Sequence, residues 1–224
     1  MGASLGSTVS SASLGIALVA IFGALAIFGS ETKRHWLMAL AKPIATACLL
    51  LVVGPPPTGD VEKLIAFGIV FSILGDALLV NQSDRAFFAG TAAFLTAQLL
   101  YAAAFWTLRS PEHPISPAAL VVVLVSAALV ASLWKPAGAL RPAIVVYAVA
   151  ITLMVSTALG TIGGPLAPPA AILAAVGAVL FYISDATLAW NKFRRPLPYA
   201  AVVTMGVYWI GQIGIALAIR LASA

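Results

Sequence analysis

The sequence predicts an all-α membrane protein with eight transmembrane helices. Three observations lead to this fold class: 62% of the 224 residues are hydrophobic, only 8% are charged, and the mean hydropathy is +1.08. A soluble domain of this size could not carry such a composition on its surface. A helix needs about 20 apolar residues to cross about 30 Å of hydrocarbon, so each apolar stretch of that length is a candidate span.

The candidate spans follow one another with short connections. In chain order they are residues 12–30, 36–53, 62–81, 86–108, 116–134, 140–160, 169–191 and 198–221. Residues 1–11 are polar and lack Lys and Arg, so we expect no signal peptide and a first span that stays in the mature protein. Pro43 lies near the start of the second span and Pro55 follows its end, two places where helices accept proline. Helix-breaking segments rich in Pro and Gly occupy residues 54–59, 110–114 and 163–169. The chain 1–224 is therefore one transmembrane domain.

The placement of the basic residues predicts the orientation. With eight spans, three basic residues lie on one side of the membrane: Lys63, Arg109 and Arg220. The other nine lie on the opposite side: Lys33, Arg34, Lys42, Arg85, Lys135, Arg141, Lys192, Arg194 and Arg195. Positive loops stay in the cytoplasm, so we expect a multi-pass protein of the cell (inner) membrane with both termini outside. A basic fringe of this kind contacts membrane lipids and implies no nucleic acid.

The two halves of the chain, residues 12–108 and 116–221, resemble each other. Three landmarks keep their order: Lys42 and Arg141 open the second span of each half, Asp76 and Asp185 lie in the third, and Gln98 and Gln212 lie in the fourth. Four spans per half give both halves the same orientation. We therefore expect two parallel repeats around a polar cavity, related by an axis along the membrane normal.

Asp76 and Asp185 are the only acidic residues inside the long apolar stretches. A carboxylate in hydrocarbon costs about 2.5 kcal/mol or more, so we interpret both as catalytic. Each lies five or six residues before the predicted cytoplasmic end of its span, which is about 8–9 Å deep. We expect them to face one cavity in the cytoplasmic leaflet.

Other polar residues could line the same cavity and bind a substrate: Gln98, Tyr101, Tyr147, Tyr208 and Gln212. A tyrosine or glutamine in a membrane helix also commonly bonds to a neighbouring helix, and this alternative stays open for each of them. Lys42 and Arg141 would form an anion-binding mouth above the aspartates.

Several chemistries are excluded by what the sequence lacks. The chain has one cysteine, Cys48, which we expect to pack, and His35 and His113 lie in loops near opposite faces, so we expect no metal site. No nucleotide-binding fingerprint and no serine-hydrolase motif occurs, and we expect no cofactor. An acid/base pair beneath an anion-binding mouth remains.

Several segments resemble the lysoplasmalogenases of the YhhN-like group of integral membrane proteins. The matching pieces are Lys42-Pro43, residues 74–79, residues 90–101, Pro142 with Tyr147, residues 181–189 and residues 208–212. They extend from the second to the eighth predicted span, so the resemblance covers nearly the whole chain. Gln98 is a departure, because we expect histidine at this place in much of the family.

The resemblance implies a lysophospholipid substrate and hydrolysis of its vinyl ether bond, which releases a fatty aldehyde and a glycerophospho head-group compound. In this chemistry a protonated carboxylic acid supplies a proton to the alkene, while an ionised partner stabilises the cation or activates water, as in glycoside cleavage. One alternative is a proton-coupled transporter of a small or lipid-like solute. Another is a lipid-binding or scaffolding protein without turnover.

Overall fold

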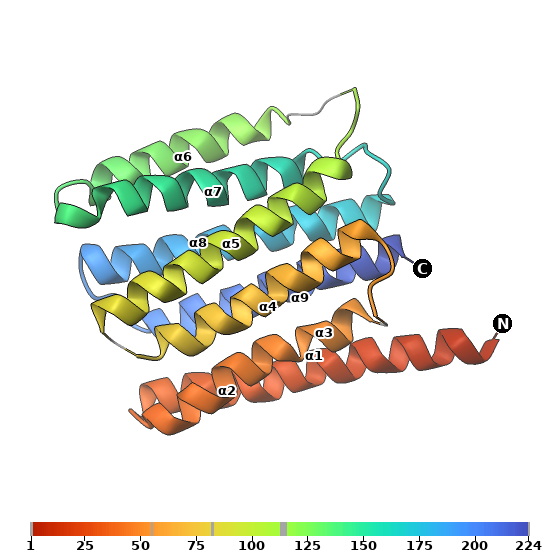
Figure 1. Cartoon of the computed structure of the whole chain (residues 1–224), viewed down its shortest axis with the longest axis horizontal. Helices are drawn as coiled ribbons and strands as arrows, with labels where there is room; N and C mark the ends of the chain where they lie inside the picture. The colour runs from red at the N-terminus through yellow and green to blue at the C-terminus, as the bar shows by residue number, and fades with distance from the viewer. Residues whose placement is uncertain (1, 55, 82, 113–115, 224) are drawn as a thin grey trace.

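The computed structural model describes residues 2–54, 56–81, 83–112 and 116–223, with side chains from residue 11 onward. These residues form helices and no strands (Figure 1). The elements are α1 (Gly2–Glu31), α2 (His35–Ala47), α3 (Leu49–Val53), α4 (Asp60–Leu79), α5 (Asp84–Thr107), α6 (Ala118–Leu133), the 3-10 helix η1 (Gly138–Leu140), α7 (Arg141–Leu159), α8 (Pro168–Phe193) and α9 (Ala200–Ala222). The chain passes back and forth between the two ends of the bundle (Figure 1).

Six segments of the described chain are long and apolar enough to cross a membrane. They are residues 11–31, 35–53, 84–107, 138–159, 168–193 and 200–222. The second combines α2 and α3, which meet at Cys48. Two other helices do not meet these criteria. α6 has only 16 residues, and α4 carries three charged residues in its first turn and a fourth, Asp76, near its end. The all-helical, multi-pass fold is confirmed, whereas the count of eight spans stays a prediction.

The four helices α4, α5, α8 and α9, which carry Asp76, Gln98, Asp185 and Gln212 respectively, lie in the middle of the molecule (Figure 1). α4 packs along α5, and α8 packs along α9. α1 to α3 lie on one side of these four helices, and α6 and α7 lie on the other (Figure 1). Asp76 of α4 and Asp185 of α8 are therefore surrounded by other helices instead of facing the lipid chains.

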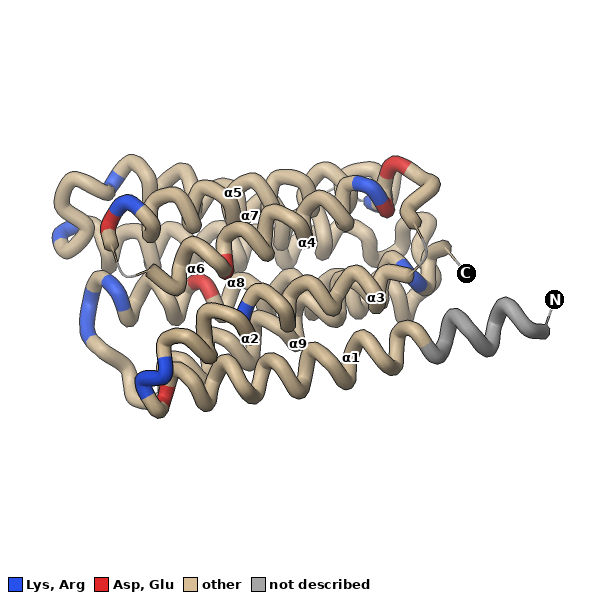
Figure 2. The backbone as a smooth tube through the Cα atoms, turned by 60° about the horizontal axis from the view of Figure 1, so that its bottom comes forward, with Lys and Arg blue, Asp and Glu red and all other residues tan. Residues whose placement is uncertain are grey.

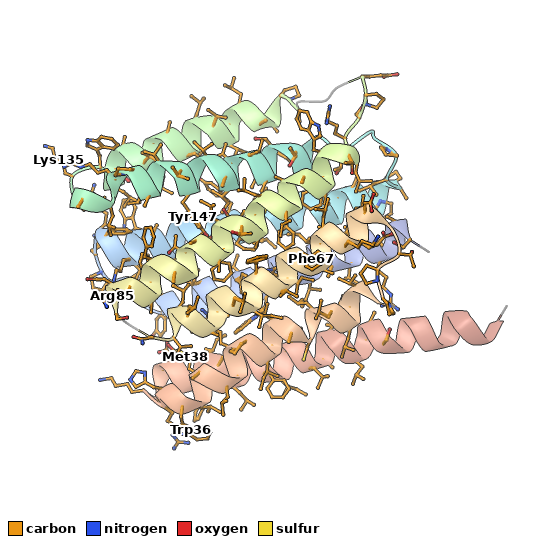
Figure 3. All side chains as sticks on the ribbon, viewed as in Figure 1. Trp36, Met38, Phe67, Arg85, Lys135 and Tyr147 are labelled. Carbon is orange, nitrogen blue, oxygen red and sulfur yellow. The ribbon has the colours of Figure 1, made fainter. Side chains whose placement is uncertain are left out.

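Basic residues gather at one end of the bundle, which we call the basic end (Figure 2). It contains the connections at residues 32–34, 80–83, 134–140 and 194–199. Lys135 and Arg85 both lie at this end in Figure 3. The other end carries both termini (Figure 1) and few basic positions (Figure 2).

Two helix ends differ from the predicted spans. α4 ends at Leu79, two residues before the predicted end, and α8 continues to Phe193, two residues beyond it. Asp76 is therefore three residues and Asp185 eight residues from the end of its helix, where we expected five or six for both. Hydropathy marks where hydrocarbon can surround a chain, but backbone hydrogen bonds continue past polar residues such as Asn191 and Lys192.

α8 and α9 approach each other closely at two glycines. A Cβ added to Gly177 would lie 2.6 Å from the carbonyl oxygen of Gly211, and a Cβ added to Gly211 would lie 2.7 Å from the carbonyl oxygen of Gly177. Small residues allow membrane helices to pack backbone against backbone. This contact fixes α8, which carries Asp185, against α9, which carries Tyr208.

We predict that Gly177→Ala lowers the free energy of unfolding by about 1–3 kcal/mol, because the new methyl group forces two backbones apart. The measurement is thermal unfolding of the detergent-purified protein. Gly206→Ala is the control, since a Cβ at that position of α9 meets no atom within 4 Å. Equal midpoints for the two variants would show that the close approach of α8 and α9 contributes nothing to stability.

Candidate functional site

Asp76 is buried and is held by residues of two other helices. Its Oδ1 lies 3.1 Å from the Lys42 ammonium, and its Oδ2 accepts hydrogen bonds from the Thr46 hydroxyl and, at 3.2 Å, from the Tyr208 hydroxyl. Lys42 and Thr46 are one turn apart on the same face of α2, so both reach Asp76. The Trp209 indole donates to Thr46 at 3.1 Å. A cation and two donors thus compensate the buried charge.

This network continues through Gln212 of α9. Its amide nitrogen donates to the Tyr208 hydroxyl at 3.2 Å and to the Ser72 hydroxyl at 3.1 Å. Its carbonyl oxygen accepts from the Tyr101 hydroxyl at 2.9 Å. Residues spaced four apart, Ser72 with Asp76 and Tyr208 with Gln212, share one face of α4 and of α9 respectively. The network therefore joins α2, α4, α5 and α9.

Asp185 has a different environment. Its Oδ2 accepts hydrogen bonds from the Tyr147 hydroxyl at 2.5 Å and from the Gln98 amide at 2.8 Å. The same amide nitrogen donates to the Tyr147 hydroxyl at 2.8 Å. Among the described residues, no hydrogen bond reaches Asp185 Oδ1 and no cation forms an ion pair with this carboxyl group.

Arg141 stands at the position in the second half that matches Lys42 in the first, but it turns away from the aspartates. Its Nε donates to the Trp134 carbonyl at 2.7 Å, and its guanidinium lies 5.4 Å from the centre of the Trp134 ring. Lys42 is in direct contact with Asp76, although we expected it to form an anion-binding mouth above the aspartates. The two halves therefore differ in charge around their acidic residues.

A cavity of 130 Å³ opens against Asp185. Asp185 and Tyr147 contribute polar groups to a wall that is otherwise largely apolar, with Phe94, Ile151 and Tyr182 near its inner end. In Figure 3, Tyr147 lies between α7 and α5. Asp76 does not line this cavity, so the expectation that both aspartates face it was wrong. Asp76 is fully buried, while Asp185 is only partly buried.

Aromatic rings separate Asp76 from the cavity. The Tyr208 ring packs edge to face against Phe94 and Phe181, with centroids 5.8 Å and 5.3 Å apart. Phe94 also lines the cavity. The hydroxyl group of Tyr208 bonds to Asp76 while its ring supports the cavity wall, and through this residue Asp76 can influence the cavity without touching its contents.

Sequence reasoning missed three members of the Asp76 network as binding partners: Thr46, Ser72 and Trp209. Thr46 and Ser72 lie one helical turn from Lys42 and Asp76, so a search for polar residues one turn from each charged residue would have found both. Trp209 gave no signal, because an indole in a membrane span is also an ordinary packing residue. Within the described part of the chain, no three His, Cys, Asp or Glu side chains gather as metal ligands would.

A wide groove of 1080 Å³ lies between α6 and α7, next to the cavity. Its lining is mostly apolar, with exposed side chains such as Val123 and Val149. Val130 of α6 and Ala148 of α7 line both the groove and the cavity. The cavity and the groove therefore share these two lining residues.

Comparison with known proteins gives a consistent result. The sequence model of the YhhN family matches residues 37–219. Human lysoplasmalogenase TMEM86B is 34% identical over 194 residues, which are 84% of this chain and 77% of the relative. Lysoplasmalogenase TMEM86A of Bos taurus is 31% identical over 196 residues, 84% of this chain and 80% of the relative. The membrane protein YhhN of Escherichia coli O157:H7 is 28% identical over 191 residues, covering 84% and 89%. No solved structure matches.

We predict that Lys42→Met lowers the free energy of unfolding by about 3 kcal/mol, because it leaves a buried carboxylate without its cation. Adding Asp76→Asn should recover most of this loss, since an amide needs no opposite charge. Thermal unfolding in detergent measures both changes.

Lys63→Met is the matched control for this pair of variants. Lys63 lies 3.6 Å from Asp60, but both side chains are exposed, and exposed pairs contribute only about 0–1 kcal/mol. If Lys42→Met were as mild as Lys63→Met, the buried ion pair would not stabilise the fold.

Proposed function

This chain belongs to the YhhN family, and we propose that it is a membrane hydrolase that cleaves the vinyl ether bond of lysoplasmalogens. The products would be a fatty aldehyde and a glycerophospho head-group compound. The proposal is supported by one observation above all: a carboxyl group, one oxygen of which accepts no hydrogen bond from the described residues, lies in the wall of a largely apolar cavity inside a membrane protein. The relatives named lysoplasmalogenases favour this function over transport.

Vinyl ether hydrolysis needs an acid, a water molecule and little else. A proton adds to the outer alkene carbon, and the ether oxygen shares the positive charge as an oxocarbenium ion. Water adds to the inner carbon and loses a proton, which gives a hemiacetal. The hemiacetal then releases the glycerol oxygen as a hydroxyl group and becomes the aldehyde. One proton is donated and one is recovered, so the acid is regenerated.

We assign the acid to Asp185. Tyr147 and Gln98 hold its Oδ2, which leaves Oδ1 available to the substrate. No described cation pairs with the group, so it can carry the proton on Oδ1. After protonating the alkene, the Asp185 carboxylate stabilises the adjacent cation and accepts the proton of the attacking water.

Asp76 takes the second, ionised role. The Lys42 ammonium at 3.1 Å favours its charged form, and its position outside the cavity means that it acts through the electric field and through Tyr208. Two carboxyl groups in different surroundings thus divide the work, as they do in glycosidases. Gln212 and Tyr101 support Tyr208 and belong to the same positioning network.

The groove between α6 and α7 suits a lipid substrate. The cavity of 130 Å³ is too small for a complete fatty chain, but the groove of 1080 Å³ lies beside it across Val130 and Ala148. A chain that enters the cavity with its vinyl ether can reach this groove and the bilayer when the side chains of Val130 and Ala148 move apart. Lysophospholipid and membrane lipids are the partners that this arrangement requires.

The contacts of the aspartates also support eight spans in two parallel repeats. Asp76 bonds to Thr46 of the second predicted span and Tyr208 of the eighth. Asp185 bonds to Tyr147 of the sixth predicted span and Gln98 of the fourth. Each aspartate of a third span therefore contacts the second span of its own half and the fourth span of the other half, as a twofold axis along the membrane normal requires.

The proposed function is tested by giving detergent-purified protein three lysolipids that differ only at the sn-1 linkage. We expect aldehyde from the vinyl ether, and no product from the alkyl ether or the ester, because only the vinyl ether forms an oxocarbenium ion by protonation at carbon. Release of fatty acid from the ester, or no aldehyde from the vinyl ether, would reject the proposed chemistry.

We predict that Asp185→Asn lowers kcat by at least about 100-fold, since general acid catalysis contributes factors of about 10²–10⁴. Asp76→Asn should cause a loss of the same size, because it removes the charge that acts on the cavity directly and through Tyr208. The double variant should be little worse than either single one, because both residues serve one unit. Gel filtration checks that the variants remain folded, and Asp60→Asn is the control. A folded variant that keeps activity within about threefold of the parent would leave that aspartate with a structural role.

The orientation is tested by cysteine labelling in a Cys48→Ala background. Ser83→Cys and Pro196→Cys lie in connections at the basic end, and we expect a membrane-impermeant reagent to reach them only from the cytoplasm. Thr58→Cys and Ile162→Cys lie at the opposite end and should react from outside. The reverse pattern would place the Asp185 cavity on the outer leaflet.

A further inference from the structure

The cavity beside Asp185 opens at the basic end of the bundle. Its lining includes Asp84, the first residue of α5, and Phe193, the last residue of α8. The lining then continues inward to Phe94 and Ile151, which lie about 15 Å from the first residues of α5 and α7. A lipid whose vinyl ether contacts Asp185 therefore places its head group at the rim.

At this rim Asp84, which lines the cavity, forms an ion pair with Lys192, which lies beside the lining residues Asp84 and Phe87. The Lys192 ammonium lies 3.8 Å from Asp84 Oδ1 and 4.7 Å from the centre of the Phe87 ring. The Phe193 ring packs edge to face on Phe87, with centroids 6.2 Å apart. The two charged side chains are 37% and 98% exposed. An exposed pair of this kind contributes little to stability, so either member can exchange its partner for a ligand at low cost.

We propose that Lys192 and Asp84 form a head-group site for zwitterionic lysolipids, an inference that rests on the proposed function. Lys192 binds the phosphate, and Asp84 binds the ammonium group of ethanolamine or choline. The Lys192 ammonium lies over the face of Phe87, and when Lys192 turns to the phosphate this face can make a cation–π contact with the same ammonium group. Among the residues that line the cavity, the acidic ones are Asp84 and Asp185, so a cationic head group at the rim meets Asp84.

The spacing along α8 fits this assignment. Lys192 follows Asp185 by seven residues, which places both on one face of the helix about 10 Å apart along its axis. Helical side chains lean toward the helix N-terminus, so the Lys192 ammonium reaches back toward the cavity. In an extended lysoplasmalogen the phosphorus lies roughly 6 Å from the vinyl ether oxygen and the nitrogen roughly 11 Å from it, by summing single bonds. Both charged groups of the lipid therefore reach the rim when the vinyl ether is at Asp185.

The experiment measures kcat and KM for lysoplasmalogens with ethanolamine, choline and glycerol head groups. The glycerol head group keeps the phosphate but has no ammonium. We expect Asp84→Asn to raise KM about fivefold for ethanolamine and choline and to leave KM for glycerol unchanged or lower. Lys192→Gln should raise KM for all three, and kcat should change little, because the head group is bound alike before and during the reaction.

The chain offers a matched control at the opposite end. Asp60 and Lys63 form an exposed ion pair of similar length, 3.6 Å, so Asp60→Asn and Lys63→Gln should change none of these values. Equal effects of Asp84→Asn on all three lipids, or the same effects from Asp60→Asn, would overturn the head-group site.

The head-group site and the proposed reaction can fail separately. Binding of the non-hydrolysable alkyl-ether lysolipids, measured by calorimetry with parent and variants, needs no turnover. Loss of affinity in Asp84→Asn for ethanolamine and choline only, with no aldehyde from any vinyl ether, would reject the reaction and keep the site. Aldehyde release with unchanged head-group preference in Asp84→Asn would reject the site and keep the reaction.

Discussion

A carboxylate among apolar helices must find donors on the helices around it, and much of this structure follows from that requirement. Asp76 obtains a cation and a hydroxyl group from α2 and a second hydroxyl group from α9. Asp185 obtains its donors from α5 and α7. The penalty for an unpaired buried charge is several kcal/mol, so these bonds restrict how the central helices and their neighbours can be arranged.

The same requirement is met in two different ways, and the difference separates the roles of the aspartates. Lys42 neutralises Asp76 and keeps it within the protein interior. Arg141, the corresponding residue of the second half, binds the Trp134 carbonyl, and no cation among the described residues forms an ion pair with Asp185. Asp185 then faces the cavity with a free oxygen. In the arrangement that we propose, two similar halves thus contain one charge-compensated carboxylate and one carboxyl group that is available for chemistry.

The surroundings of Asp185 also explain why a lipid suits this protein better than a small polar solute. The cavity wall is largely apolar, and its neighbour is a groove between two helices whose outer side chains are apolar and exposed. The charged residues lie at the rim, where Lys192 contacts Asp84. Apolar surface at depth and paired charge at the boundary match the two parts of a lysolipid.

The sequence by itself determined the elements and the chemically exceptional residues. Apolar length located the helices, since only about 20 apolar residues can cross hydrocarbon. Asp76, Asp185 and the glutamines stood out because polar groups in such helices need a reason. These inferences depend on composition along one helix, which a sequence records directly. The missed helix ends at Leu79 and Phe193 show the limit of this reasoning even within one element.

Only the tertiary structure decided which of these residues meet. Lys42 and Asp76 are 34 positions apart, and Gln98 and Asp185 are 87 positions apart, so their contacts depend on how helices pack and rotate. Lys42 and Arg141 occupy equivalent places in the two halves, yet one turns toward an aspartate and the other toward a tryptophan carbonyl. No helical period encodes that choice. The difference arises because a long side chain takes the partner that its neighbouring helices bring within reach. The packing of the helices also decided that Asp185 faces the cavity and Asp76 does not.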